Sequence, residues 1–328
     1  MQTEHVDVCP VCTDDRREVL YDGLVDRLYG APGSWRLNRC FGCGSAYLDP
    51  RPTSASMGAA YDTYYTHDPS PQAVQTTAHG SLRKALRNDY LNARYDYDLA
   101  PAMSLGRVVV PLLPGHRAAA DRHVRRLRRS RAAARVLDVG CGNGDFLLEM
   151  RAAGWRPEGL ETDARAVQLA RARGLDVREG TLDHGAYAAG SFDAVTFNHV
   201  LEHLHDPVAT LRAAREILRE DGVLWVATPN LSSPGHARYR RAWRGLEPPR
   251  HLVLFSPSAL VVALERAGFS LVSFQRPAGA GWVYDASDRL TKGGRPGRRL
   301  AVAFADARSS RRHERGEELI ALARPRPS

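Results

Sequence analysis

The chain of 328 residues is predicted to fold as an α/β protein with a mostly parallel sheet covered by helices. Between residues 133 and 276, short apolar strands alternate with amphipathic helices, which is the pattern of such a sheet. The first strand runs into a glycine-rich turn, VLDVGCGNGDF, at residues 136–146. Far ahead of this turn, two Cys-x-x-Cys pairs predict a small metal-binding segment.

The sequence divides into three parts. Residues 1–55 are rich in Cys, Gly and Pro, and residues 56–132 have a mostly helical pattern, which predicts a lid or connector. The α/β domain is expected over residues 133–328, with insertions at residues 230–256 and 277–316.

Seven strands are predicted in the α/β part. Asp206-Pro207 and Ser256-Pro257 each place an N-cap residue before a proline at the first helical position, which predicts the start of a helix. The predicted strands cover residues 135–140, 158–161, 175–179, 192–198, 222–229, 269–275 and 317–324.

The net charge is +9, and nearly all of the positive charge is arginine. Such a charge is typical of proteins with an anionic substrate, nucleic acid or an acidic membrane as partner, but the Ala, Arg and Gly richness favours a general bias toward Arg codons. The basic run at residues 117–135 is predicted to be a solvated helix beside the sheet. No apolar run is long enough to span a bilayer and no signal peptide is visible, so we expect a cytoplasmic protein.

The glycine-rich turn predicts a cofactor site. Gly140, Gly142 and Gly144 follow the first strand, but no Gly-Lys-Ser/Thr follows them, which argues against a nucleoside triphosphate. Asp138 would repel the pyrophosphate of a dinucleotide at short range, whereas it would attract the ammonium and sulfonium groups of S-adenosylmethionine. Glu161 ends the second strand, where an acidic side chain can bind both ribose hydroxyls.

At these residues the chain resembles class I S-adenosylmethionine-dependent methyltransferases. VLDVGCGNGDF is similar to their first motif, GLETD to the acidic second motif, SFDAVTFNHVLEHLHDP to the fourth-strand motif and GVLWVATPN to the fifth strand. The resemblance implies a Rossmann-like sheet of strand order 3-2-1-4-5-7-6 with the last strand antiparallel. It also implies that Thr181 and Leu182 flank the adenine. The expected cofactor contacts are Asp138, Gly140, Gly142, Gly144, Glu161, Thr181, Leu182, Asn198 and His199.

The four N-terminal cysteines predict a structural zinc site. Cys9, Cys12, Cys40 and Cys43 form two Cys-x-x-Cys pairs with 27 residues between them, and four thiolates make a closed tetrahedral site. Together with LDPRPT and YDTYY, this segment resembles that of bacterial methyltransferases associated with sugar and glycan biosynthesis. The fifth cysteine, Cys141, is predicted to be a packing residue in the glycine-rich turn.

Several histidines are expected near the carboxyl end of the fourth strand. Methyl transfer to a hydroxyl or a carbon acid needs a base, and His251 and His203 are the candidates, with Glu202 orienting one of them or binding substrate. A second hypothesis is a divalent metal, because Glu202 and His203 resemble half of the site in metal-dependent methyltransferases of quinone precursors or small RNAs. Those enzymes have a further Glu where this chain has His199.

Aromatic and arginine side chains are candidates for the acceptor site. Tyr64, Tyr65 and Trp243 are expected to stack on a sugar or base, and Arg244 and Arg250 to bind an anionic group such as a diphosphate. A solvated arginine-coated loop is the alternative for the same residues.

The sequence therefore predicts a methyltransferase acting on a small molecule, a sugar or glycan precursor, at oxygen or carbon. The alternatives are an RNA methyltransferase that binds RNA with its zinc segment and arginines, a quinone or aromatic O-methyltransferase, and a cofactor-sensing protein without catalysis. The expected partners are S-adenosylmethionine, zinc and a small acceptor such as a nucleotide-linked sugar or a glycan. Neither nucleic acid nor a membrane span is expected.

Overall fold

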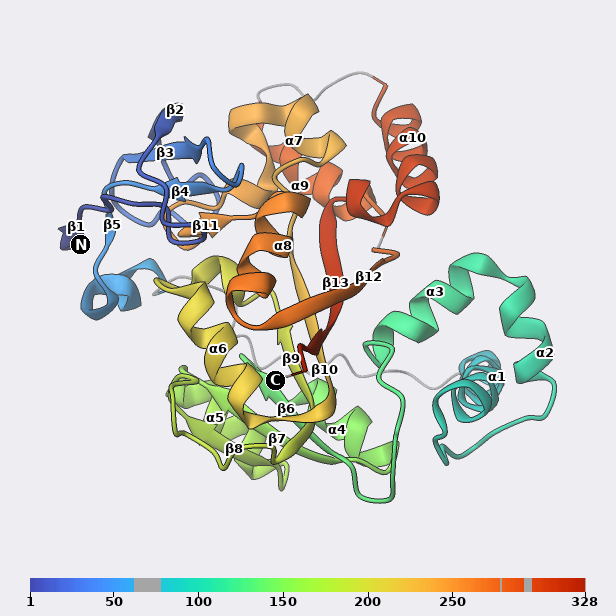
Figure 1. Cartoon of the computed structure of the whole chain (residues 1–328). Coiled ribbons are helices and arrows are strands. Elements are labelled where there is room, and N and C mark those ends of the chain that lie inside the picture. The colour runs from blue at the N-terminus through green and yellow to red at the C-terminus, as the bar shows by residue number, and fades with distance from the viewer. Residues whose placement is uncertain (62–77, 278, 292–296, 328) are drawn as a thin grey trace.

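We describe a computed structural model of the chain, covering residues 1–61, 78–277, 279–291 and 297–327 (Figure 1). Its centre is a seven-stranded sheet in the order β12-β13-β10-β9-β6-β7-β8. The strands are β6 (Arg135–Val139), β7 (Arg156–Glu161), β8 (Asp176–Glu179), β9 (Phe192–Asn198), β10 (Leu218–Pro229), β12 (Phe269–Gln275) and β13 (Glu318–Pro325).

The strand order confirms the predicted 3-2-1-4-5-7-6 arrangement. Strands β8, β7, β6, β9 and β10 pair in parallel, whereas β13 runs antiparallel to both β10 and β12. The predicted boundaries hold within a few residues, the largest difference being that β10 begins at Leu218 rather than at residue 222, with a register shift before Val223.

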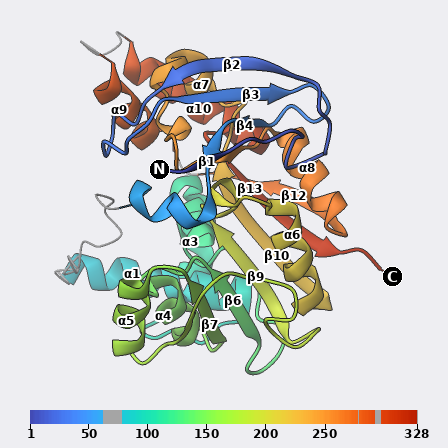
Figure 2. The same cartoon turned by 90° about the vertical axis from the view of Figure 1, so that its left-hand side faces the viewer.

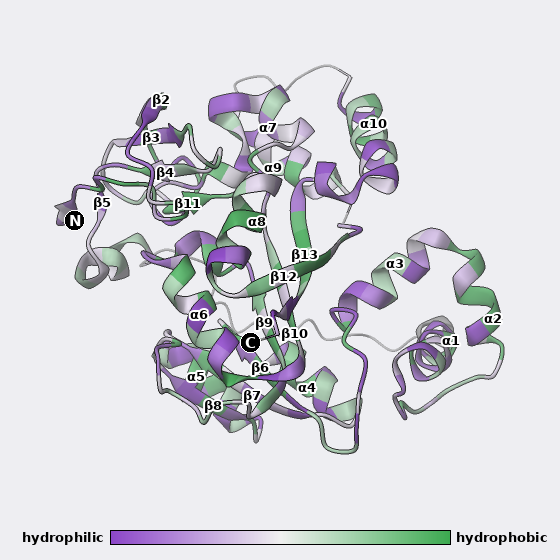
Figure 3. Ribbon diagram, viewed as in Figure 1, coloured by the Kyte–Doolittle hydropathy of each residue, from purple (hydrophilic) through white to green (hydrophobic). Residues whose placement is uncertain are grey.

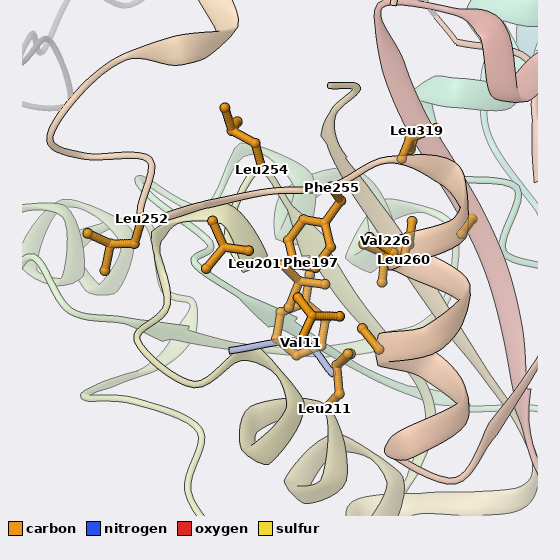
Figure 4. Close-up of a cluster of buried hydrophobic side chains, with 14 of the residues drawn as sticks. Val11, Phe197, Leu201, Leu211, Val226, Leu252, Leu254, Phe255, Leu260 and Leu319 are labelled. Atoms are coloured by element: carbon orange, nitrogen blue, oxygen red, sulfur yellow. The ribbon is translucent and has the colours of Figure 1, made fainter. Parts of the chain in front are cut away.

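Helices cover both faces of the sheet. Side chains alternate along β6, so that Val136 packs with the cluster on the α3 and α4 side, whereas Leu137 packs with the α6 and α8 side. Figure 4 shows part of the second cluster, where Phe197 of β9 lies among leucines from α6 and α8. The helices of the α/β part are α4 (Asp145–Ala152), α5 (Ala164–Ala172), η4 (Leu201–His203), α6 (Pro207–Ile217), α7 (Pro234–Tyr239), η5 (Arg240–Ala242), η6 (Arg244–Leu246), α8 (Pro257–Arg266), α9 (Gly281–Leu290), α10 (Arg298–Arg311) and η7 (His313–Arg315).

The predicted helix starts are confirmed in their capping geometry. Asp206 accepts a hydrogen bond from the backbone N–H of Ala209 at the start of α6, and Ser256 accepts one from Ala259 at the start of α8. Each cap satisfies a backbone donor that has no partner inside its helix.

The N-terminal segment is built into the α/β part rather than attached to it by a linker. Its four-stranded sheet has the order β11-β4-β3-β2, and the edge strand β11 comes from the chain after β10. Figure 2 shows β2, β3 and β4 above one end of the central sheet. The strands of this segment are β1 (Thr3–Glu4), β2 (Arg17–Leu24), β3 (Trp35–Cys40), β4 (Ala46–Leu48), β5 (Arg51–Pro52) and β11 (Val253–Leu254), of which β1 pairs with β5.

A helical arm follows the N-terminal segment. Within the described residues it consists of η1 (Ser54–Ala60), α1 (Ala78–Tyr95), α2 (Gly106–Val109), η3 (Val110–Leu112) and α3 (Pro114–His123). No helix among the described ranges is both long and apolar enough to cross a membrane.

The helix predicted over residues 117–135 is corrected by the structure. The helix α3 ends at His123, and Arg125 and Arg126 both have positive φ angles. The buried carboxylate of Asp121 accepts hydrogen bonds from the hydroxyls of Tyr90 and Tyr95, and its backbone carbonyl accepts one from Arg126 N–H. These contacts end the helix and turn the Arg125 side chain toward the sheet.

Candidate active site

The glycine-rich turn connects β6 to α4 at the carboxyl edge of the sheet. Gly140, Gly142 and Gly144 all have φ angles between +54° and +84°, which side chains other than glycine rarely adopt. A Cβ on Gly140 or Gly144 would meet Val200 or Leu175 within 2.5 Å, whereas a Cβ on Gly142 would point into open space. Gly142 is therefore the point at which a ligand can approach the backbone closely.

Glu161, the predicted ribose contact, lies beside this turn. One carboxylate oxygen accepts a hydrogen bond from Gly142 N–H at 2.8 Å. The other accepts bonds from Thr162 N–H and Asp163 N–H at 2.7 and 3.0 Å. Glu161 thereby fixes the turn at the C-terminal end of β7.

The other predicted cofactor residues surround the same edge. Leu182 is buried, and the exposed Thr181 donates its hydroxyl hydrogen to Asp183 at 2.7 Å. Asn198 is exposed at the end of β9. Cys141 is buried, and burial raises the pKa of its thiol, which fits the predicted packing role.

Asp138 is buried and paired with an arginine that sequence reasoning missed. One of its oxygens binds the guanidinium of Arg125 and accepts the hydroxyl of Thr196 at 2.8 Å. Arg125 also donates to Thr196, and its guanidinium lies 3.5 Å from the centre of the Phe146 ring. The sequence predicted a solvated helix over this stretch. In the structure, the helix ends at His123, and the turn that follows brings Arg125 to the cofactor edge.

A cavity of about 360 Å³ opens next to this pair. Its walls come from α3, the start of α4, the end of β9 and the strands β10 and β13. Arginine, histidine and carboxylate groups line it together with two aromatic rings. The lining residues are Arg122, His123, Arg125, Asp145, Phe146, Glu149, Asn198, His199, Trp225, Ala227, Glu318 and Ile320.

His199 forms one wall of this cavity and bridges two carboxylates. Its Nδ1 lies 3.1 Å from Glu202 and its Nε2 lies 3.2 Å from Glu318. Burial lowers the pKa of His199, but these two hydrogen bonds outweigh burial and raise the pKa to about 10. Burial likewise opposes ionisation of Glu202, but the bond from His199 brings the pKa of Glu202 down to about 2. The pair is thus an imidazolium and a carboxylate.

His203 and His251, the two predicted candidates for the base, lie together beside Glu202. Their ring centres are 4.8 Å apart and the rings meet edge to face. The Nδ1–H of His203 donates to the Arg250 carbonyl at 2.9 Å, and that of His251 donates to the Gly245 carbonyl at 2.7 Å. Burial lowers the pKa of both imidazoles, that of His251 well below its usual value. Both rings are therefore neutral, with the lone pair on Nε2.

The same three side chains have the donor set of a metal site. One donor atom each from Glu202, His203 and His251 falls within a cluster of 4.8 Å. Histidine ligands of metals commonly donate their other N–H to a backbone carbonyl, as both rings do here. A carboxylate and two imidazoles would suit a divalent transition metal.

The predicted acceptor contacts of Arg250, Arg244 and Trp243 are corrected by the structure. Arg250 is fully buried and donates to Asp26, Glu247 and the carbonyl of Ala60, each at 2.8–2.9 Å. Arg250 thus joins the N-terminal segment to the loop that carries His251.

The remaining candidates are also bonded within the protein. Arg244 pairs with Glu247, and Trp243 is buried with its Nε1–H directed at Glu317. Arg241 donates to the carbonyls of Asp22 and Gly23, so this part of the arginine-rich loop binds the N-terminal segment. The predicted stacking residues Tyr64 and Tyr65 lie outside the described residues.

The four N-terminal cysteines form the predicted cluster. Their sulfur atoms all lie within 4.8 Å of one another, with 3.7 Å between Cys9 and Cys43 and 3.4 Å between Cys12 and Cys40. A tetrahedral zinc–thiolate site would give sulfur–sulfur distances of roughly 3.8 Å. The arrangement therefore fits a zinc ion.

Comparison with known proteins identifies the class of the α/β part. Residues 115–274 match the family model described as a methyltransferase domain. With the strand order and the glycine-rich turn, this match makes the segment a class I S-adenosylmethionine-dependent methyltransferase domain.

Individual relatives are similar over a shorter stretch. The chain is 40% identical over 106 residues to the ubiquinone biosynthesis O-methyltransferase of Xanthomonas oryzae, covering 30% of this chain and 44% of that protein. It is 32% identical over 107 residues to the same enzyme of Haemophilus ducreyi. The chain thus spans less than half the length of these relatives. A solved complex of the Haloferax volcanii Trm112 activator with a putative methyltransferase is 18% identical, with a TM-score of 0.48 over 74% of this chain and 95% of that one.

Proposed function

We propose that this protein is an S-adenosylmethionine-dependent methyltransferase acting on a hydroxyl group of a small molecule. The observation that carries the proposal is the pair of neutral imidazoles, His203 and His251, whose Nδ1–H groups are bound to backbone carbonyls. Their unprotonated Nε2 atoms lie near the carboxyl end of β9, the edge where α/β sheets bind ligands.

The cofactor would bind along the glycine-rich turn. S-adenosylmethionine supplies an electrophilic methyl group on a cationic sulfur. The open side of Gly142 accepts close approach, and Glu161 stands beside it for the ribose hydroxyls. Arg125 lies at the other end of the turn, where its guanidinium is suited to the carboxylate of an amino acid.

The two imidazoles would do the proton chemistry. Nε2 of His203 or His251 accepts the proton of the acceptor hydroxyl, so that the oxygen becomes a nucleophile. His203 is the more accessible ring, and His251 packs behind it. Glu202 does not orient them directly, since its oxygens bind His199 and the hydroxyl of Thr228. Phe146 and Trp225 give the neighbouring cavity part of an apolar wall.

A sugar or glycan precursor is the first acceptor class. This class is supported by the resemblance of the N-terminal four-cysteine segment to the corresponding segment of sugar-modifying methyltransferases. The cysteine cluster, with a structural zinc ion, would serve to shape this end of the enzyme rather than to react, because all four positions around the metal are filled by thiolates.

An aromatic hydroxyl is the second candidate. The similarity to ubiquinone O-methyltransferases and the Glu202, His203 and His251 donor set both favour it. A divalent metal there would bind a phenolate or catecholate oxygen and lower the pKa of the hydroxyl, in place of base catalysis.

The test uses methyl-labelled S-adenosylmethionine, purified protein and fractionated cell extract. Label in small sugars or lipid-linked glycan supports the first acceptor class. Label in an aromatic fraction that disappears after chelation and returns with a divalent metal supports the second. Ribonuclease-sensitive label would overturn both in favour of RNA. Failure to bind S-adenosylmethionine in calorimetry would overturn the proposal as a whole.

A further inference from the structure

The helical arm presents an exposed apolar surface that the methyl-transfer site does not use. We call residues 103–113, which include α2 and η3, the apolar tip. Leu105, Val108 and Leu112 are 59%, 60% and 75% exposed. Figure 3 shows this apolar stretch on the outer edge of the arm. The exposed apolar side chains of the tip are Met103, Leu105, Val108, Val109, Leu112 and Leu113.

The inner side of the apolar tip is firmly packed, so this exposure is built into the fold. Gly106 lies against α1 so closely that a Cβ there would stand 1.9 Å from the Leu86 carbonyl oxygen. Asp89 of α1 accepts hydrogen bonds from both the backbone N–H and the guanidinium of Arg107, at 2.7 and 2.8 Å. Met103 N–H donates to the Ala85 carbonyl at 3.1 Å.

Polar side chains of α1 also hold the chain that leads into the tip. Asn88 donates to the carbonyl of Pro101 at 3.0 Å, and Asn92 binds both the N–H and the carbonyl of Leu99. With the backbone fixed from the inside, the apolar side chains of the tip are directed outward. Exposure of these apolar side chains to water is unfavourable, and contact of the apolar tip with an apolar medium would remove that cost.

The charge around the tip is positive. Residues 99–120 contain no Asp or Glu, and their His116 and Arg117 are exposed, whereas the guanidinium of Arg107 is paired with Asp89 of α1. Arg83 and Lys84 are exposed on the neighbouring helix α1. A short outward apolar segment with basic neighbours has the composition that binds at the interface of an anionic bilayer, where apolar side chains enter the acyl boundary and cations meet lipid phosphates.

A second exposed apolar pair lies on α10, on the side of the molecule away from the four-cysteine segment (Figure 1). Leu300 and Phe304 stand one turn apart on α10 and are both largely exposed. In Figure 1, α2 lies at the far right and α10 at the upper right of the molecule, both away from the four-cysteine segment. Arg299, Arg308 and Arg311 on α10 are exposed as well. Exposed apolar side chains and arginines thus also occur together on α10.

We propose that the apolar tip docks the protein on the surface of an anionic lipid membrane, with its leucines and valines inserted and its basic residues on the headgroups. This docking is peripheral and needs no helix that spans the bilayer. It does not depend on the acceptor or on methyl transfer.

The test is sedimentation of the full-length protein with two kinds of vesicle. Vesicles containing phosphatidylglycerol should bind the protein, and pure phosphatidylcholine vesicles should bind it much less. A triple variant, Leu105→Ser, Val108→Ser and Leu112→Ser, should weaken binding by about tenfold or more, because three inserted side chains are lost. Arg83→Glu with Lys84→Glu should weaken binding to the anionic vesicles and reduce its salt dependence.

A matched control separates the tip from exposed apolar residues in general. Val19 of β2 and Val272 of β12 are also more than half exposed, and changing both to Ser should leave vesicle binding unchanged. All variants should keep the wild-type melting temperature within a few degrees. Equal vesicle binding by wild type and the triple variant would overturn the proposal. So would a wild-type protein that ignores vesicles but is a dimer that the triple variant breaks, since the tip would then contact a second copy.

Discussion

At the scale of single residues, the site depends on which atoms already have partners. His203 and His251 each use Nδ1 to hold a backbone carbonyl, and Nε2 of His251 lies 3.7 Å from a carboxylate oxygen of Glu247. Arg250, next to His251 in the chain, uses its guanidinium entirely inside the protein. Two neighbouring residues of one motif therefore have different tasks: Arg250 is structural, and His251 is one of the two proposed bases.

Replacing His251 by Ala should lower kcat by about 100-fold or more while leaving the affinity for S-adenosylmethionine within about twofold, because only proton transfer is lost. Steady-state kinetics and calorimetry measure the two effects. His184→Ala is the control, since His184 is an exposed ring paired with Glu216. An unchanged kcat for His251→Ala would remove this ring from the mechanism.

Replacing Gly142 by Ala should weaken binding of S-adenosylmethionine by about tenfold or more, because the new Cβ enters the open space by which the ligand approaches. Gly190→Ala is a matched control: its φ of +60° resembles the +54° of Gly142 and its Cβ also meets no atom. Both variants should lose about 1 kcal/mol of stability from the left-handed backbone. If both bind the cofactor equally well, Gly142 does not line its site.

At the scale of elements, the four-cysteine segment supports the loop that carries His251. Strand β11 pairs with β4, so that Val253 and Leu254 lie opposite Tyr47 and Ala46. Ser258, at the start of α8, donates to the Cys43 carbonyl at 3.0 Å. A metal site at the cysteines would thus stabilise an element more than two hundred residues away in sequence.

Removal of the proposed zinc should therefore affect the active site before it affects the central sheet. After chelation, hydrogen exchange should speed up at β4 and β11, whereas β6 and β9 should stay protected, and turnover should fall. Cys43→Ser should behave likewise without chelator, and Cys141→Ser should keep its metal content. Protein purified without chelator that contains no zinc would contradict the assignment.

At the scale of the whole molecule, a buried ion-pair cluster holds the N-terminal segment against the α/β part. Arg250 binds Asp26 from the chain after β2, Glu247 from its own loop and Ala60 from η1. The hydrophobic core is likewise shared, because Val11, Trp35 and Leu252 belong to one cluster. The parts that the sequence divides near residue 55 are thus packed as one unit.

Replacing Arg250 by Lys should destabilise the protein by about 3 kcal/mol, because a compact ammonium cannot reach the three acceptors spread around the guanidinium, and a buried carboxylate loses its partner. Arg36→Lys, at an exposed pair with Asp22, should change stability by less than about 1 kcal/mol. Chemical denaturation compares the two. Equal effects would mean that the cluster does not hold the two parts together.

By itself the sequence determined the class of sheet, its strand order through the family resemblance, the glycine-rich turn, the cysteine cluster and the histidines near β9. These features depend on local periodicity, capping residues and short spacings, which a single stretch of chain contains. Only the tertiary structure decided the roles of Arg125, Arg250, Arg244 and Trp243, because a side chain's task depends on which distant groups satisfy its donors and whether water reaches it. Arg125 was expected in a solvated helix but lies at the cofactor edge, because a turn after α3 brings it to Asp138 on β6. Arg250 was expected at the acceptor site but belongs to a buried cluster, because its partner Asp26 comes from the N-terminal segment.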